Sequence, residues 1–249
     1  MDLNIHTTQP LLSIRGLHKS FGSNKVLDNV NLDLFKGENK VILGRSGSGK
    51  SVLIKCIIGL LPIDEGSIQI LGQPIPEFGT PDWNLVRKNV GFLFQSNALY
   101  DSMTVYENLA FPLRRLKRTL SSKDQSLLMQ EALREVGLEH TGNMMPAELS
   151  GGMKKRIALA RTIILKPQII LYDEPTTGLD PITSKEIMSL ITSIQKTHGT
   201  ASLIISHDMN VVRECSDSVV MLINGTCYAE DSYSNLLHSK DELIVPYFN

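Results

Sequence analysis

Residues 44–51 read GRSGSGKS, a stretch that could hold the phosphates of a nucleotide. It fits the pattern G-x-x-x-x-G-K-[ST] and directly follows the apolar run 40–43, which is the strand-to-helix context that such a loop requires. Gly44 and Gly49 would let the backbone approach phosphate oxygens, and the following helix would turn its positive end toward them. We expect Lys50 to meet the β- and γ-phosphates and the Ser51 hydroxyl to meet Mg²⁺. The other expected nucleotide-binding positions of this loop are Arg45, Ser46, Gly47, Ser48 and Val52.

A second element that could act on a nucleotide is the segment 169–174, which reads IILYDE. It looks like an apolar strand that ends in two carboxylates, and neighbouring side chains at a strand end point in different directions. We therefore expect Asp173 to hold Mg²⁺, directly or through water, and Glu174 to orient or deprotonate the attacking water. The alternative for this segment is a strand end whose carboxylates are simply solvated. The alternative for residues 44–51 is a Gly/Ser-rich turn before an ordinary helix.

A second glycine-rich stretch, LSGGMKKRIALAR at 149–161, also leads into a helix. Ser150, Gly151 and Gly152 suit an anion at the helix start, although a serine N-cap followed by flexible glycines explains them equally well. The stretch has no Lys-Ser pair that could hold Mg²⁺. Apolar residues then recur at helical spacing, at Met153, Ile157, Ala160 and Ile164. The cations fall mainly off this stripe, so we expect most of them to face solvent: Lys154, Lys155, Arg156 and Arg161.

These segments belong to a chain of 249 residues whose composition is that of an ordinary globular protein, with 42% hydrophobic residues. The 25 Lys and Arg nearly balance the 26 Asp and Glu, which argues against a basic nucleic-acid footprint. We expect no nucleic-acid partner. The three cysteines lack CxxC spacing, so we expect them to be reduced and structural. The N-terminus has no visible secretion signal, and no apolar run approaches the roughly 18 residues that cross a bilayer.

The pattern of apolar residues predicts the elements that position these motifs. Alternation at 12–17 and 30–34 predicts an antiparallel edge sheet, and short apolar runs predict further strands at 67–71, 90–94, 168–172, 203–206 and 218–223. Between 105 and about 165 the apolar spacing is helical, with Ser121 or Ser122 as a cap and Gly137 as a stop. We expect one α/β domain over 1–249. Its mixed-sheet core and β subdomain would occupy 1–95 and 166–249, and a helical insertion would occupy about 96–165.

The ordered set of motifs resembles an ABC-type ATPase over essentially the whole chain. The set comprises GRSGSGKS, Gln95 after an apolar strand, LSGGM, IILYDE, TGLD and His207 in IISHD. The resemblance implies a P-loop fold of this kind, in a subunit that forms a head-to-tail dimer with a second copy and hydrolyses ATP with Mg²⁺.

The same resemblance suggests roles for four residues outside the two phosphate-binding stretches. Gln95 looks like the Q-loop residue that reaches Mg²⁺ and the lytic water, and Asp180 in TGLD looks like the acid that meets the opposite protomer. His207 resembles the switch histidine beside the γ-phosphate, and Phe21 stands where an aromatic ring stacks on adenine. By themselves these residues would be a surface glutamine, a helix N-cap, a loop histidine and a surface aromatic.

In the family, the stretch LSGGM of one protomer closes on the γ-phosphate held by the other. Ser150, Gly151 and Gly152 would then complete the partner's site with a hydroxyl, backbone N–H groups and a helix N-terminus. Met153 departs from the glutamine usual at this position. The phosphate-facing groups precede it, so we expect this change to be tolerated.

The stretch FLFQSNALYDSMTVYENLAFPLR together with LSGGM looks like the ATPase subunits of Mla/Mce-type systems, which move phospholipids between the membranes of diderm bacteria. This resemblance implies a transmembrane permease, an Mce-type lipid-binding protein reached through it, and a peripheral location on the cytoplasmic face of the inner membrane. Candidate permease-facing residues, of which we expect at least half to be core, are Leu99, Tyr100, Met103, Val105, Tyr106, Leu109 and Phe111.

Other functions remain open from the sequence. An importer ATPase for another substrate, such as amino acids, has the same motifs. A soluble ABC ATPase acting on DNA or ribosomes would generally show a long coiled-coil insertion or two cassettes in one chain, and the sequence shows neither. The presence of Lys50, Asp173, Glu174 and His207 argues against a binding-only switch. The tail DELIVPYFN is apolar enough to dock on its own core or on a second protomer.

Overall fold

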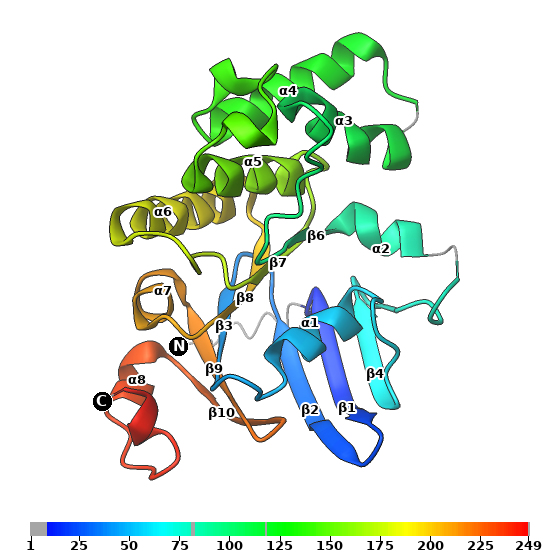
Figure 1. Ribbon diagram of the computed structural model, residues 1–249. Helices are drawn as coiled ribbons and strands as arrows, with labels where there is room; N and C mark the ends of the chain where they lie inside the picture. The colour runs from blue at the N-terminus through cyan, green and yellow to red at the C-terminus, as the bar shows by residue number, and fades with distance from the viewer. Residues whose placement is uncertain (1–8, 81–82, 118, 249) are drawn as a thin grey trace, which may run out of the picture.

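The computed structural model describes residues 9–80, 83–117 and 119–248, which form two sheets and a set of helices (Figure 1). Residues 1–8, where the sequence predicts no secretion signal, lie outside the described ranges. The first sheet is antiparallel with the order β2-β1-β4-β5. Its strands are β1 (Leu12–Phe21), β2 (Asn24–Leu34), β4 (Glu65–Ile70) and β5 (Gln73–Pro74). The edge sheet expected from the alternation at 12–17 and 30–34 is confirmed, because those apolar residues face the core.

The second sheet has the order β10-β9-β3-β8-β7-β6 and is parallel except for β10. Its strands are β3 (Asn39–Leu43), β6 (Val90–Leu93), β7 (Ile169–Asp173), β8 (Ala201–Ser206), β9 (Ser218–Ile223) and β10 (Thr226–Asp231). β3 and β8 are buried along their whole length, as expected for central parallel strands covered on both faces. The strands expected after the edge sheet are all present, with ends shifted by at most two residues.

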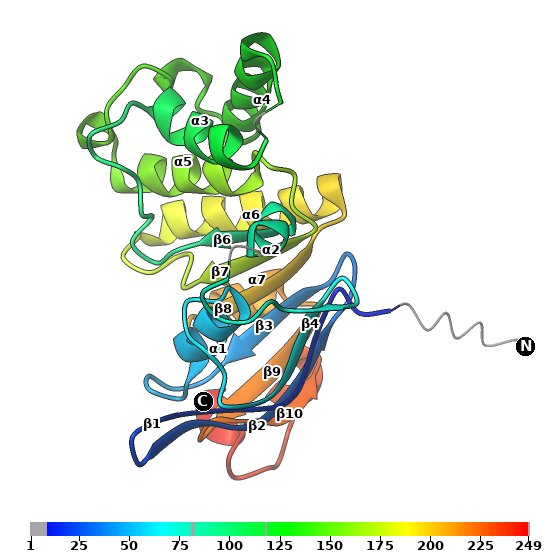
Figure 2. The same ribbon diagram turned by 90° about the vertical axis from the view of Figure 1, so that its right-hand side faces the viewer.

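Helices cover both faces of this second sheet. On one face, α1 (Lys50–Ile57) packs between the two sheets, and α2 (Trp83–Asn89) lies beside it. On the other face lie α6 (Pro181–His198), α7 (Met209–Cys215) and α8 (Tyr233–Leu237). Figure 2 shows the antiparallel sheet at one end of the molecule and a group of helices at the other. The mixed α/β fold class expected from the sequence is confirmed.

The group of helices at the far end consists of α3 (Val105–Leu116), α4 (Ser122–Glu135) and α5 (Gly151–Ile163), with short 3₁₀ turns at Glu139–Thr141 and Pro146–Glu148. Thr104 and Glu107 form a capping box at the start of α3, and Ser121 caps α4. The three helices enclose their own apolar cluster, to which α5 contributes Ile157 and Ala160, and its C-cap residue Ile164 also joins it. The other side of α5 packs on the second sheet through Ala158 and Leu159, so α5 joins the helical group to the sheet.

The packing of α5 corrects one expectation. Lys155 is only 2% exposed, and Arg161 is half-buried, although the apolar stripe predicted that most of the cations would face solvent. The reason is that α5 is covered on two sides rather than one, so positions off the stripe are also enclosed.

The C-terminal segment docks on the chain's own core, one of the two alternatives left by the sequence. Ile244 is 5% exposed and joins the apolar cluster of α6 and α7, and a 3₁₀ turn at Val245–Tyr247 follows it. The Phe248 ring lies 5.8 Å from that of Tyr233. The three cysteines are free thiols, as expected: Cys56, Cys215 and Cys227.

Candidate functional site

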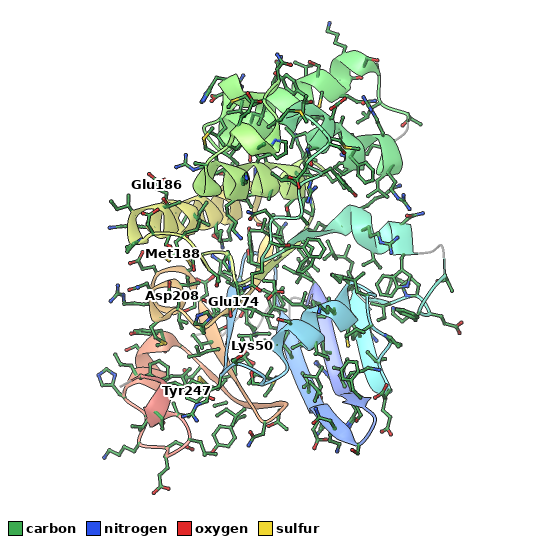
Figure 3. The ribbon with its side chains drawn as sticks, viewed as in Figure 1. Lys50, Glu174, Glu186, Met188, Asp208 and Tyr247 are labelled. Carbon is green, nitrogen blue, oxygen red and sulfur yellow. The ribbon has the colours of Figure 1, made fainter. Side chains whose placement is uncertain are left out.

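Four parallel strands bring the expected site residues to one edge of the second sheet. β3 leads into the loop at 44–49, β8 leads to His207, β7 ends at Asp173, and β6 ends two residues before Gln95. These strands are neighbours in the order β3-β8-β7-β6, and their carboxyl ends share one edge of the sheet. Figure 3 places Lys50 and Glu174 close together near the middle of the molecule, where α1 begins.

Glycine is required at several positions of the loop before α1. A Cβ at Gly44 would lie 2.5 Å from the Leu222 carbonyl oxygen, and one at Gly49 would lie 2.8 Å from the Val26 carbonyl oxygen. Gly47 and Gly49 also have φ of 82° and 101°, in the region that favours glycine. The helix start has no side-chain cap, and the buried Ser48 hydroxyl has no hydrogen-bond partner within the described residues. The backbone N–H groups of this loop and the Ser48 hydroxyl therefore suit an anionic ligand.

The Lys50 ammonium lies inside this loop and is nearly buried, with 7% of the residue exposed. Its Nζ donates to the carbonyl oxygens of Gly44 at 2.7 Å and Arg45 at 3.0 Å. Burial lowers the pKa of Lys50, while the nearby carboxylates of Glu174 and Asp173 act in the opposite direction. A desolvated cation on the loop's inner side is available to phosphate oxygens.

Ser51 and Asp173 form a pair of oxygen donors beside Lys50. The Ser51 Oγ donates to Asp173 Oδ1 at 3.3 Å. Burial raises the pKa of Asp173, and the Ser51 hydrogen bond opposes that rise. A hydroxyl and a carboxylate are the donors that Mg²⁺ takes when phosphates supply its other ligands, so these residues fit the ion. The described residues contain no group of three or more His, Cys, Asp or Glu that could hold a metal alone.

Glu174 faces a different partner from Asp173, as the alternation predicts. Its Oε1 and Oε2 lie 2.9 and 2.8 Å from His207 Nδ1, and its Oε2 accepts from Thr177 Oγ1 at 3.3 Å. The Glu174 backbone has a φ of 49° and its N–H donates to the Ile205 carbonyl oxygen at 3.0 Å. A left-handed backbone at a non-glycine residue is held only where its surroundings fix it, and such strain gathers at functional sites. The carboxylate is thereby directed at the His207 ring rather than at Ser51.

Of these groups, Lys50, Ser51, Glu174 and His207 line one pocket of about 700 Å³. Its lining residues are Phe21, Val26, Ser46, Gly47, Gly49, Lys50, Ser51, Val52, Gln95, Glu174 and His207. Phe21 is 46% exposed, so its ring is open to a planar group. Val26 was not expected, because nothing in the alternating pattern of β2 separates a pocket-lining valine from any other. Gly44, Arg45, Ser48 and Asp173 lie next to lining residues and do not line the pocket themselves.

The second glycine-rich stretch and Asp180 lie together, but they do not line this pocket. Ser150 caps α5, with its Oγ accepting from the Met153 N–H at 3.2 Å. Asp180 caps α6 and accepts from the Thr183 hydroxyl at 2.6 Å. A Cβ at Gly152 would lie 2.6 Å from the Thr183 side chain, whereas a Cβ at Gly151 would meet nothing within 4 Å. The chain's own packing explains glycine at 152 and leaves open space at 151.

The candidate permease-facing residues divide between core and surface. Val105 and Leu109 are fully buried, while Tyr100 and Phe111 are 42% and 36% exposed, with rings 4.9 Å apart. These two rings line a cleft of about 430 Å³ with Phe94 and Arg161. The remaining candidates, Leu99, Met103 and Tyr106, are half-buried. No described helix has both the length and the apolar character needed to cross a membrane.

Comparisons with known proteins agree with this geometry. The model of the ABC transporter family matches residues 27–177. The chain is 40% identical to the probable ribonucleotide transport ATP-binding protein mkl of Mycobacterium leprae, over 96% of this chain and 68% of that protein. It is 37% identical to the methionine import ATP-binding protein MetN of Clostridium tetani, over 85% of this chain and 66% of that protein. It therefore spans about two thirds of the length of these two relatives.

A third relative is matched over more of its length. This is the intermembrane phospholipid transport system ATP-binding protein MlaF of Haemophilus influenzae, 36% identical over 96% of this chain and 90% of that protein. Among solved structures, the dimeric structure of MJ0796, a bacterial ABC transporter cassette, is 31% identical. It covers 89% of this chain and 98% of that chain, with a TM-score of 0.81. MJ0796 has also been solved in a post-hydrolysis state bound to ADP and Pi, with a TM-score of 0.80. The chain belongs to the ABC transporter family and carries its ATP-binding domain.

Proposed function

We propose that this chain hydrolyses ATP as one of two head-to-tail copies that drive a separate membrane permease for phospholipid. The observation that carries the ATPase part is the shared pocket, in which Lys50, Glu174 and His207 face one space. Hydrolysis of a nucleoside triphosphate uses a phosphate loop, an oxygen pair for a divalent cation and a carboxylate base together.

Each residue has a role that its position supports. Lys50 and the loop N–H groups would bind the β- and γ-phosphates, and Phe21 would stack on the base. Glu174 would take a proton from the attacking water. His207 is hydrogen-bonded to the Glu174 carboxylate and would orient that carboxylate toward the γ-phosphate. Ser51 and Asp173, with Gln95 from the lining of the pocket, would hold Mg²⁺. When bound, this ion would neutralise charge on the phosphate oxygens.

The position of the second glycine-rich stretch supports a dimer. Ser150, Gly151 and Asp180 stand outside the pocket, and the space at Gly151 is open on the chain's own side. A second copy in head-to-tail orientation would bring these groups to the exposed side of a γ-phosphate held in its pocket. The dimeric cassette of MJ0796 supports this arrangement.

The cleft beside Tyr100 and Phe111 is the proposed contact for the permease. Two exposed aromatic rings on a largely apolar cleft are typical of a surface that receives another protein. The chain would then lie on the cytoplasmic face of the membrane, held there by its permease.

Phospholipid is the proposed substrate because MlaF of Haemophilus influenzae is matched over 90% of its length. An Mce-type lipid-binding protein would then be a further partner through the permease. The methionine import proteins MetN are similar to a comparable degree, so an importer ATPase for a small molecule is the second candidate.

The test is transport by the complex that this chain forms. The complex, purified through a tagged copy of the chain, would be reconstituted into vesicles with a fluorescent phospholipid. We expect phospholipid transfer that needs ATP and stops in the Lys50→Ala variant. ATP-dependent methionine uptake without phospholipid transfer would instead establish the importer, and absence of ATP hydrolysis would overturn the whole proposal.

A further inference from the structure

A buried lysine of α5 is bonded to the backbone of Gln95. Lys155 Nζ donates to the Gln95 carbonyl oxygen at 2.9 Å, and Lys155 is 2% exposed. Within the described ranges this is its one side-chain hydrogen bond, and no ion pair accompanies it. The bond therefore joins α5 directly to Gln95, which lies two residues after β6 and lines the pocket.

A second cation of the same helix supports the same segment. Arg161 donates to the Asn97 carbonyl oxygen at 3.2 Å, and its guanidinium carbon lies 5.8 Å from the centre of the Tyr100 ring. Lys155 and Arg161 thus bond carbonyl groups two residues apart in the chain. The segment from Gln95 to Asn97 is held against α5 at both ends.

The backbone is left-handed at the end of this segment and at the residue after it. Asn97 and Ala98 have φ of 65° and 50°, a region that asparagine adopts more readily than most residues but that costs energy for alanine. Such a conformation persists only where neighbouring groups fix it. The donors from α5 are such groups, so the position of Gln95 depends on them.

An apolar residue would suit the position of Lys155 better if it served packing alone. Lys155 is 2% exposed, and enclosing an ammonium in this way costs free energy because burial disfavours the charged form. Replacing Lys155 alone by an apolar residue would leave the Gln95 carbonyl oxygen without this donor, which has its own cost. The amino group therefore serves its bond to Gln95 rather than packing.

We propose that Lys155 is a positioning residue that ties Gln95 to the helix whose first turn carries Ser150, Gly151 and Gly152. This inference rests on the proposed dimeric ATPase. Lys155 follows Ser150 by five residues, or about 7.5 Å along one rigid helix. When the nucleotide of a partner copy binds the start of α5 and shifts this helix, the bond from Lys155 transmits the shift to Gln95 in this copy's own pocket. One side chain then links the two nucleotide sites of the dimer.

The decisive variant is Lys155→Met, which keeps the apolar stem and removes the donor. We expect the ATP affinity to stay within about twofold, because the phosphate loop is unchanged. We expect kcat to fall by about tenfold to hundredfold, since small misplacements of a site group have effects of that size. The Hill coefficient for ATP should fall toward one. Hydrogen exchange of the amides at 93–99 should become faster, a readout that does not depend on turnover.

Two further variants complete the test. Lys155→Arg keeps a donor and should recover most of the turnover, and Lys123→Met on the exposed side of α4 should behave as wild type. If Lys155→Met does not fold, Lys155→Leu replaces it, since leucine also lacks a donor.

The inference is overturned if the methionine variant retains turnover within twofold of Lys123→Met and exchanges 93–99 at the same rate. A wild-type protein that binds ATP without hydrolysing it would instead refute the proposed function. The exchange rates would still decide whether Lys155 holds the segment.

Discussion

Replacing Glu174 by glutamine tests the assignment of the catalytic base. The change keeps the length of the side chain and an oxygen that can accept from His207 Nδ1, and it removes the negative charge and the basic oxygen. General-base catalysis contributes about 10²- to 10⁴-fold to a rate. At 1.36 kcal/mol for each factor of ten, that is about 3 to 5 kcal/mol of barrier.

The same change should hardly affect folding. Although Glu174 is largely buried, the His207 side chain is 65% exposed, so water replaces much of the lost contact. Ion pairs with an exposed partner contribute roughly 0 to 1 kcal/mol to the free energy of unfolding. The backbone bond from Glu174 to Ile205 is unaffected by the substitution. We therefore expect kcat to fall by at least about a hundredfold at nearly unchanged stability and ATP affinity.

The assay combines phosphate release, binding of a fluorescent ATP analogue and size-exclusion chromatography with ATP. The variant should bind ATP, release almost no phosphate and elute as a dimer. Glu131→Gln, which alters a surface pair with Lys166, is the matched control and should hydrolyse ATP normally. Turnover by the Glu174 variant within threefold of this control would refute the role of Glu174 as the base.

Three further predictions concern other parts of the chain. Met153→Gln should leave ATP turnover within about tenfold, because the groups proposed to face phosphate precede it in α5; a collapse of phosphate release would contradict this. Ile244→Ala should lower the free energy of unfolding by about 2 to 4 kcal/mol in urea titrations, whereas Leu243→Ala, at a position that is 50% exposed, should change it little. Equal effects would show that the tail is not docked. Burial raises the pKa of each cysteine thiol from 9.0 to about 11, so unfolded thiols lose their protons first. The free energy of unfolding should therefore fall as pH rises from 9 to 11, and a flat urea midpoint over that range would contradict it.

The parts predicted from the sequence are those whose chemistry is continuous in the chain. The loop at 44–51 needs glycines, a lysine and a serine at fixed spacing, so its phosphate-binding role can be predicted from the sequence alone. Gln95 and His207 are single residues, and only their order among other motifs pointed to the pocket that both now line.

The sequence could not predict features that depend on which other elements pack against a helix or strand. A periodic stripe on α5 indicates one covered side, whereas the helix is covered on two sides and Lys155 is buried between them. Glycine at 152 is explained by Thr183, which is distant in the chain and whose position only the packed helices reveal. Likewise, the left-handed backbone of Glu174 has no signal in the letters IILYDE.

The strand order also determines when the nucleotide site can form during synthesis. The antiparallel sheet uses only residues 12–74, so its partners are made early. β3, by contrast, pairs with β8 and β9, which lie in the last fifth of the chain. The hydrogen bond from the Asn39 N–H to Asp217 spans 178 residues. Such distant pairing slows folding and prolongs the exposure of apolar strands. A nascent chain therefore carries its phosphate loop on an unpaired strand until β8 and β9 have been made, and ATP can stabilise the protein only from that point on.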